Sequence, residues 1–230
     1  MAQFNDIHWI VTDIEGTTTD VSFVYQVLFP YFIDHLATLE QAGSPEVEDG
    51  LIKARQWIQE ETGEKDLTRH ELIARIKAWA LEDRKITPLK TLQGVLWKSG
   101  YASGMLKGHV YPDVPEALER WRKHNISLAV FSSGSVTAQQ LLFRHSLYGD
   151  VSTYFTAYFD TNTGPKREMH TYLNIAESLS CAPSRVLFLS DIYEELEAAD
   201  ASGMCTIQLL RPGTVARWKH TAFNFTEILP

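Results

Sequence analysis

Residues 13–19 read Asp-Ile-Glu-Gly-Thr-Thr-Thr and follow a short apolar run at residues 7–11. The apolar run predicts a buried strand of a parallel sheet. Asp13 and Glu15 then fall at the carboxyl end of this strand, and Gly16 permits a sharp turn. Because ligands of open parallel sheets bind beyond the carboxyl ends of the strands, a carboxylate at this place can attack an electrophile or hold a hard cation.

Three later segments also place polar side chains after a strand or turn pattern. They are Ser132, Ser133 and Gly134 after the apolar run at 126–131, Lys166 after a Gly-Pro turn, and Asp191 and Glu195 after the apolar run at 186–189. A Ser-Ser-Gly turn offers hydroxyl and N–H donors to an anion. Each segment alone is typical of an ordinary loop, but their order along the chain indicates one site.

This order of motifs resembles the haloacid dehalogenase superfamily of phosphatases. The first motif of that superfamily usually reads Asp-x-Asp-Gly-Thr, and here its second acid is Glu15. The last motif usually carries a second Asp four residues after the first, and here that position is Glu195. Both departures, together with the triple threonine, make the chain similar to the enolase-phosphatases of the methionine salvage pathway.

The resemblance implies a substrate and two reactions. In that family 2,3-diketo-5-methylthiopentyl-1-phosphate is enolised and then dephosphorylated to the acireductone 1,2-dihydroxy-3-keto-5-methylthiopentene. The expected partner is therefore a small phosphorylated diketone. A phosphate ester repels a carboxylate nucleophile, so attack requires that the phosphoryl charge be neutralised first, and Mg²⁺ is the expected cofactor.

The resemblance also implies a role for each residue of the motifs. Asp13 is the expected nucleophile, which forms an aspartyl-phosphate, and the Glu15 side chain is the expected general acid and base. The expected metal ligands are the carboxylates of Asp13 and Asp191 and the backbone carbonyl of Glu15. The expected phosphate ligands are Ser132, Ser133, the N–H of Gly134, and Lys166, and Glu195 is expected to support Lys166 or a metal-bound water.

For the enolisation step, the base and the electrophile each have two candidates. Its base is either Glu15 or a residue of the helical insert described below, and its electrophile is either Mg²⁺ or Lys166. Aromatic residues of the insert are expected to hold the methylthio tail. Phe23 is a candidate for substrate contact, because it lies just past the first motif.

The periodicity predicts an α/β fold, a doubly wound parallel sheet with a helical insert after the first strand. The resemblance implies that this insert is the cap domain. The expected core comprises residues 1–19 and 109–230, and the expected cap comprises residues 20–108. Ser44 before Pro45 predicts a helix N-terminus, and Thr68 with Glu71 predicts a capping box. In the core, further strands are expected at residues 154–160 and 206–210, and a short last strand at residues 223–228.

Composition excludes several classes of protein. The 230-residue chain carries a net charge of −8 without a Lys/Arg-rich run, which argues against a nucleic-acid partner. No apolar stretch is long enough to span a membrane, and no signal peptide is expected. Cys181 and Cys205 do not form a disulfide framework and fit a reducing compartment, so a cytoplasmic protein is expected. A monomer is favoured, because no interface helix is evident.

Two other interpretations stay open at this point. The first is a capped phosphatase of the same superfamily that acts on another small phosphate ester, which an Asp at position 15 would favour. The second is a non-catalytic, metal-dependent interaction protein on the same scaffold, which the complete set of expected site residues disfavours.

Overall fold

The computed structural model describes residues 6–228, which form two compact units. One unit comprises the residues up to Val21 and those from Lys107 onward, and the other is Ser22–Leu106. The helical unit is two residues shorter at each end than the expected insert, 20–108.

The first unit is built on a parallel sheet. Within residues 6–228 the sheet has six strands in the order β3-β2-β1-β4-β5-β6, and every neighbouring pair is parallel. The strands are β1 (Trp9–Thr12), β2 (Ser127–Phe131), β3 (Ala157–Phe159), β4 (Val186–Ser190), β5 (Cys205–Leu209) and β6 (Thr221–Ala222). Because β1 pairs with both β2 and β4, the loops that follow these three strands meet at one edge of the sheet.

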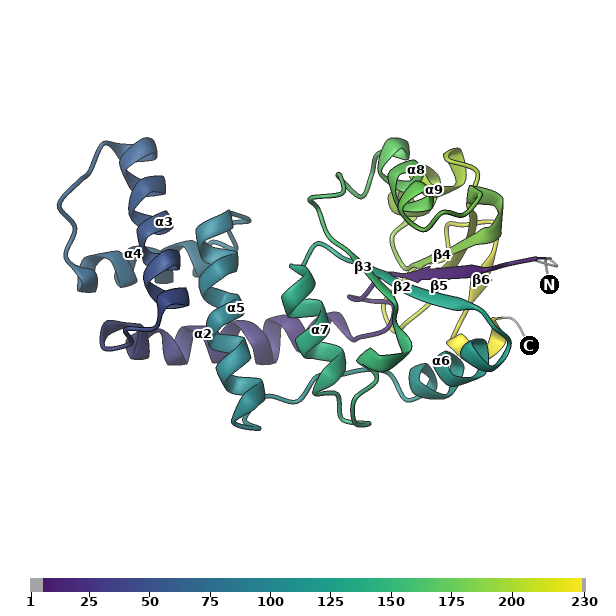
Figure 1. Ribbon diagram of the computed structural model, residues 1–230, viewed down its shortest axis with the longest axis horizontal. Coiled ribbons are helices and arrows are strands. Elements are labelled where there is room, and N and C mark those ends of the chain that lie inside the picture. The colour runs from purple at the N-terminus through teal and green to yellow at the C-terminus, as the bar shows by residue number, and fades with distance from the viewer. Residues whose placement is uncertain (1–5, 229–230) are drawn as a thin grey trace. The chain divides into compact units, whose positions relative to one another are not determined.

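Helices cover both faces of this sheet. The helices of this unit are α6 (Asp113–Lys123), α7 (Val136–Arg144), α8 (Met169–Ser178) and α9 (Tyr193–Ala201). Figure 1 shows α8 and α9 on one face and α6 on the other. All five residues of β4 are buried, as expected of a strand that is covered on both sides. The predicted doubly wound α/β sheet is thereby confirmed.

Two predicted strands differ from the structure. The third strand is shorter than the predicted 154–160, because a 3-10 turn, Ser152–Tyr154, precedes it. The predicted last strand at 223–228 is wrong. A 3-10 turn lies there instead, since the Asn224 side chain accepts a hydrogen bond from the backbone N of Thr226 at 3.0 Å and so caps the turn.

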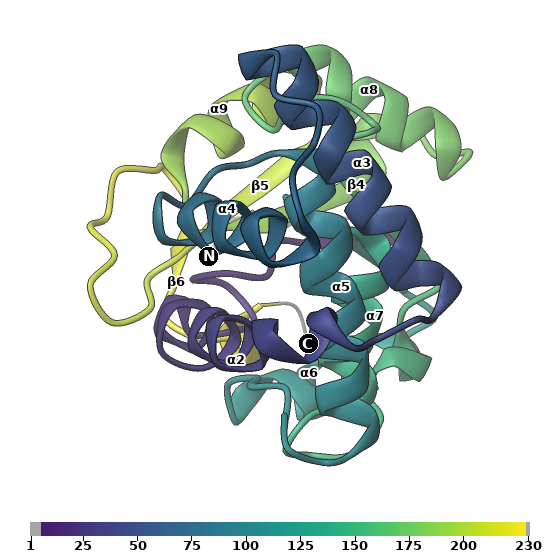
Figure 2. The same ribbon diagram turned by 90° about the vertical axis from the view of Figure 1, so that its left-hand side faces the viewer.

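The second unit is helical. Its elements are α1 (Val21–Phe23), which begins at the boundary, a π-helical turn (Val24–Leu28), α2 (Phe29–His35), a 3-10 helix (Leu36–Glu40), α3 (Pro45–Thr62), α4 (Arg69–Leu81) and α5 (Thr87–Ala102). Figure 2 shows α3 and α5 side by side. Gly50 permits this approach, because a Cβ atom there would lie 2.6 Å from the side chain of Leu92.

The predicted helix starts are confirmed in this unit. The Ser44 hydroxyl accepts from the backbone N of Val47 at 3.3 Å, at the start of α3. Thr68 and Glu71 form the capping box of α4. None of the helices among the described residues is both long enough and apolar enough to cross a lipid bilayer.

Candidate active site

The segment that follows β1 folds into a tight turn. The backbone N–H groups of Thr17, Thr18 and Thr19 all donate to the carbonyl of Ile14, at 3.1, 2.9 and 2.9 Å. Gly16 has a φ of 74°, and a Cβ atom at this position would lie 2.4 Å from a carboxylate oxygen of Asp191. Only glycine therefore lets the turn after β1 pack against the turn after β4.

Lys166 joins this turn to α9. Its buried Nζ lies 2.6 Å from Oδ1 of Asp13 and 2.7 Å from Oε2 of Glu195. The Tyr172 hydroxyl donates to the Lys166 carbonyl at 2.6 Å and so fixes the backbone that carries this ammonium group. A buried ammonium is tolerated because it is paired with carboxylates.

The charges of this cluster act on each other through a buried environment. Burial opposes the positive charge of Lys166, but Asp13 and Glu195 outweigh it and raise the pKa of this lysine. Burial and the negative charge of Asp13 raise the pKa of Glu195 to about 7, although Lys166 acts in the opposite direction. Glu195 also accepts a hydrogen bond from the Ser190 hydroxyl at 2.9 Å.

The turn after β2 contacts the turn after β1 through Ser132. The Ser132 hydroxyl donates to Oε2 of Glu15 at 3.1 Å and accepts from the backbone N of Gly134 at 3.2 Å. Ser132 is buried, whereas Ser133 in the same turn is exposed. Burial and the neighbouring Asp13 carboxylate raise the pKa of Glu15. A raised pKa favours the protonated form of this carboxyl group, which a general acid requires.

Asp191 is incompletely paired. Its backbone N donates to the Thr17 hydroxyl at 3.1 Å, but its buried Oδ1 has no hydrogen-bond partner among the described residues. Burial and the Asp13 carboxylate raise the pKa of Asp191 to about 7. The cluster thus combines one ammonium group with four carboxyl groups, those of Asp13, Glu15, Asp191 and Glu195.

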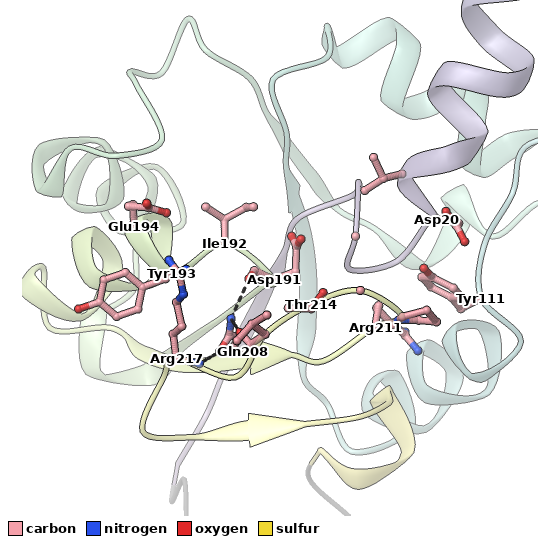
Figure 3. A pocket seen from close by; sticks show the side chains of 15 residues that line it. Asp20, Tyr111, Asp191, Ile192, Tyr193, Glu194, Gln208, Arg211, Thr214 and Arg217 are labelled. Atoms are coloured by element: carbon pink, nitrogen blue, oxygen red, sulfur yellow. Dashed lines mark hydrogen bonds between the residues drawn. The ribbon is translucent and has the colours of Figure 1, made fainter.

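A pocket of about 430 Å³ opens beside Asp191 (Figure 3). Its walls are the turn at residues 191–194, the loop at residues 211–217, and the side chains of Tyr111 and Asp20. Within the part of the chain that the structure describes, Asp191 is the one carboxylate of the cluster that lines this pocket.

Arg211, which was not expected from the sequence to belong to the site, lines the pocket and holds the turn after β1. Its Nε donates to the Thr17 carbonyl at 3.0 Å, and its terminal nitrogens lie 2.9 and 2.8 Å from the two carboxylate oxygens of Asp113. The guanidinium also lies 4.0 Å from the ring centroid of Tyr111. A signal was present, since Arg211 follows a predicted strand near the same edge of the sheet as the other site residues.

The sequence is similar to known hydrolases over nearly its whole length. The family model of haloacid dehalogenase-like hydrolases matches residues 7–203. Enolase-phosphatase E1 of Sorangium cellulosum is 53% identical over 96% of this chain and 97% of its own length. Enolase-phosphatase E1 of Pseudomonas savastanoi pv. phaseolicola is 50% identical over 96% of each chain.

The chain belongs to the enolase-phosphatase E1 family of haloacid dehalogenase-like hydrolases. A crystal structure of the UTR4 protein of Saccharomyces cerevisiae has a fold similar to that of this enolase-phosphatase family member. The TM-score is 0.82 and the identity 34%, with 97% of this chain and 100% of the yeast chain covered.

The structure brings most of the expected site residues to one edge of the sheet. Direct contacts link Lys166 to Asp13 and to Glu195, and Glu15 to Ser132, while Asp191 packs against Gly16. The contacts of Asp13 with Lys166 and of Glu15 with Ser132 join segments that lie more than 100 residues apart in the sequence. An arrangement of a buried carboxylate, a lysine, a hydroxyl and a second carboxyl group can perform phosphoryl transfer.

Proposed function

We propose that this chain is a bifunctional enolase-phosphatase of methionine salvage. It enolises 2,3-diketo-5-methylthiopentyl-1-phosphate and then removes the phosphate, which gives 1,2-dihydroxy-3-keto-5-methylthiopentene. The observation that carries the proposal is the similarity to proteins named Enolase-phosphatase E1, which are 46–53% identical over 96% of this chain.

The residues of the cluster fit a divalent cation. The carboxylates of Asp13 and Asp191 and the backbone carbonyl of Glu15 would hold Mg²⁺, which prefers oxygen ligands. The excess of carboxyl groups over the single Lys166 ammonium and the unpaired Oδ1 of Asp191 support this assignment. A bound Mg²⁺ would neutralise the charge of the phosphoryl group.

Water would complete the ligand set. Within residues 6–228 no group of three or more His, Cys, Asp or Glu side chains is placed to hold a metal ion. The proposed ligands are two carboxylates and one carbonyl, and an octahedral ion has further positions for other oxygens. Mg²⁺ usually keeps several of its waters. The pocket of about 430 Å³ beside Asp191 has room for them, since a water molecule occupies about 30 Å³ in the liquid.

The turn after β2 would bind the phosphate. Ser132, Ser133 and the N–H of Gly134 would supply donors there, and Lys166 adds a positive charge beside Asp13. The Ser132 hydroxyl and the Gly134 N–H would exchange their present acceptors, Glu15 and Ser132, for phosphoryl oxygens. Ser132 and Lys166 contact Glu15 and Asp13 respectively, which supports a phosphoryl group placed between the two turns.

Hydrolysis follows in two displacements. An oxygen of Asp13 attacks phosphorus, the bond from phosphorus to the substrate oxygen breaks, and Glu15 gives its proton to that leaving oxygen. Water then attacks phosphorus, Glu15 takes a proton from the water, and the bond from phosphorus to Asp13 breaks. Phosphate leaves and both side chains return to their starting states.

Enolisation precedes these displacements. A base removes a proton from the carbon that bears the phosphate ester, and a proton is added to the neighbouring carbonyl oxygen. The base is Glu15 or a side chain of the helical unit. Replacement of Glu15 by Gln distinguishes the two, because enol formation survives only where the base lies elsewhere.

The test is an anaerobic incubation with the diketone phosphate and Mg²⁺. The absorbance of the enol and of the acireductone is followed beside phosphate release, and both products are expected. Hydrolysis of p-nitrophenyl phosphate without any reaction of the diketone would indicate a phosphatase for another ester. Failure to hydrolyse either compound would indicate a non-catalytic protein.

A further inference from the structure

Two glutamines are buried at the carboxyl edge of the sheet without a part in the proposed reaction. Gln139 on α7 is 2% exposed, and Gln208 on β5 is 1% exposed. Glutamine is rarely buried to this degree, because an amide that loses water must regain its hydrogen bonds within the protein. The partners of the two amides therefore show what each one holds in place.

Gln139 holds the turn after β2. Its Nε2 donates to the carbonyls of Gly134 at 2.8 Å and Phe159 at 2.9 Å, and the Ser132 carbonyl lies 3.5 Å away. Three carbonyl oxygens around one end of the amide require that this end be the nitrogen. The opposite oxygen is buried without a partner among the described residues, so the amide is retained for its donors.

Gln208 holds the turn after β4. Its Nε2 donates to the carbonyls of Asp191 at 2.9 Å and Val215 at 3.1 Å. Its Oε1 accepts from the backbone N–H groups of Arg217 at 2.9 Å and Trp218 at 3.1 Å. All four hydrogen bonds of the amide are made, and they fasten the backbone of Asp191 to the loop that walls the pocket (Figure 3).

We infer that Gln139 and Gln208 are positioning residues with separate tasks. Gln139 fixes the phosphate-binding turn and Gln208 fixes the metal-binding turn, an inference that rests on the proposed function. Among the described residues, Gln139 makes no hydrogen bond to the turn after β4, and Gln208 makes none to the turn after β2. Loss of one amide should therefore impair one ligand and leave the other.

The physical reason lies in the backbone. The carbonyl of Asp191 is anchored by Gln208, and the carboxylate that would hold the metal extends from that same residue. Residues that orient metal ligands from behind typically contribute 10-fold to 100-fold to metal affinity. Gln139 acts in the same way on Gly134, whose N–H would donate to a phosphoryl oxygen.

The test uses Gln139→Met and Gln208→Met, each of which is the matched control of the other. Methionine has a similar length and shape but no donor. Calorimetric titrations measure the Kd of Mg²⁺ alone, and then the Kd of inorganic phosphate at saturating Mg²⁺. Gln208→Met should weaken Mg²⁺ binding by about 10-fold to 100-fold and leave phosphate binding within about twofold. Gln139→Met should weaken phosphate binding by about 10-fold and leave Mg²⁺ binding within about twofold.

The outcomes separate the inference from the proposed function. Equal weakening of both ligands by either variant, or a lower thermal unfolding temperature with unchanged affinities, would show a merely structural role and overturn the inference alone. An unsubstituted protein that binds neither ligand would overturn the proposed function as well. Should a methionine variant fail to fold, Gln→Asn keeps an amide at the position. It is one methylene too short to span its partners, so it should show the same selective loss.

Discussion

At the scale of single residues, the site is defined by unequal charge. Lys166 is the ammonium group within hydrogen-bond distance of Asp13 and Glu195, and Glu15 and Asp191 add two further carboxyl groups nearby. The contact with Lys166 fixes the position of the Asp13 carboxylate, as a nucleophile requires. Among the described residues, no other carboxylate of the site contacts this lysine except Glu195.

Asp13→Asn should therefore lower the rate of phosphate release by more than ~10⁴-fold, because an amide cannot act as the nucleophile. Asparagine keeps an oxygen for the 2.6 Å contact with Lys166, so the fold should be preserved. Enol formation should be lowered less, because it does not require a nucleophile. The measurement is single-turnover absorbance of the enol beside phosphate release.

Asp150→Asn is the control for Asp13→Asn. Asp150 is an exposed carboxylate that accepts from Ser152, and its loss should leave both rates unchanged. If Asp13→Asn lost enol formation as completely as phosphate release while still binding substrate, Asp13 would act in both reactions. The division between Asp13 and a separate base would then be wrong.

At the scale of elements, periodicity and turn chemistry were sufficient to predict the strands and helix starts that hold the site. The buried runs before Asp13, Ser132 and Asp191 are strands, and their polar ends meet because parallel strands share an edge.

The contacts of Arg211, Gln208 and Gln139 were not predictable in this way. They join segments through tertiary packing, and no local pattern encodes which distant carbonyl an amide or guanidinium will reach. The misplaced last strand has a local and a tertiary cause. Asn224 caps the 3-10 turn, and the backbone N of Phe225 in that turn donates to a carboxylate oxygen of Asp113.

Arg211→Lys should lower kcat by about 10-fold to 100-fold, because displacement of a catalytic group by about 1 Å can cost about 100-fold in rate. Lysine cannot reproduce the paired contact with Asp113 and the bond to the Thr17 carbonyl together. Steady-state phosphate release measures the effect. The control is Arg185→Lys, which alters an exposed ion pair with Asp6 and should leave kcat unchanged. Equal rates for both variants would remove Arg211 from the support of the turn.

Thr68→Ala should lower the free energy of unfolding by about 1 kcal/mol, because the side chain caps α4 and belongs to its capping box with Glu71. Urea denaturation measures this change. Thr87→Ala is the matched control, since Thr87 opens α5 without capping it and its substitution should fall within about 0.5 kcal/mol of the unsubstituted protein. A Thr68→Ala variant as stable as the control would show that the capping box contributes nothing.

At the scale of the whole molecule, both the chain and the site are acidic, and both therefore oppose the binding of an anion. A protein of net charge −8 that concentrates four carboxyl groups around one lysine repels the phosphate ester it is proposed to bind. The attraction must therefore come from a bound cation and from local donors. Removal of the cation is expected to affect stability as well as activity.

In chelator, the protein should be inactive and should become less stable as the pH rises from about 4 to about 7. The pKa values of Asp191 and Glu195 are raised to about 7 in the folded protein, so unfolding releases protons in this range. Their stabilising contribution is complete below the unfolded pKa near 4 and is lost as the pH passes 7.

Mg²⁺ binds the ionised carboxylates, so it should restore activity and raise the unfolding temperature more at pH 8 than at pH 5.5. With Mg²⁺ at 100 times its Kd at pH 8, the rise at pH 8 should be about 5–10 °C, from about 2.7 kcal/mol of binding free energy, and the same concentration should have a smaller effect at pH 5.5. Asp191→Asn should lose this Mg²⁺ effect and flatten the pH dependence measured in chelator. Full activity in chelator, or an equal Mg²⁺ effect at both pH values, would contradict a cation held by these carboxylates.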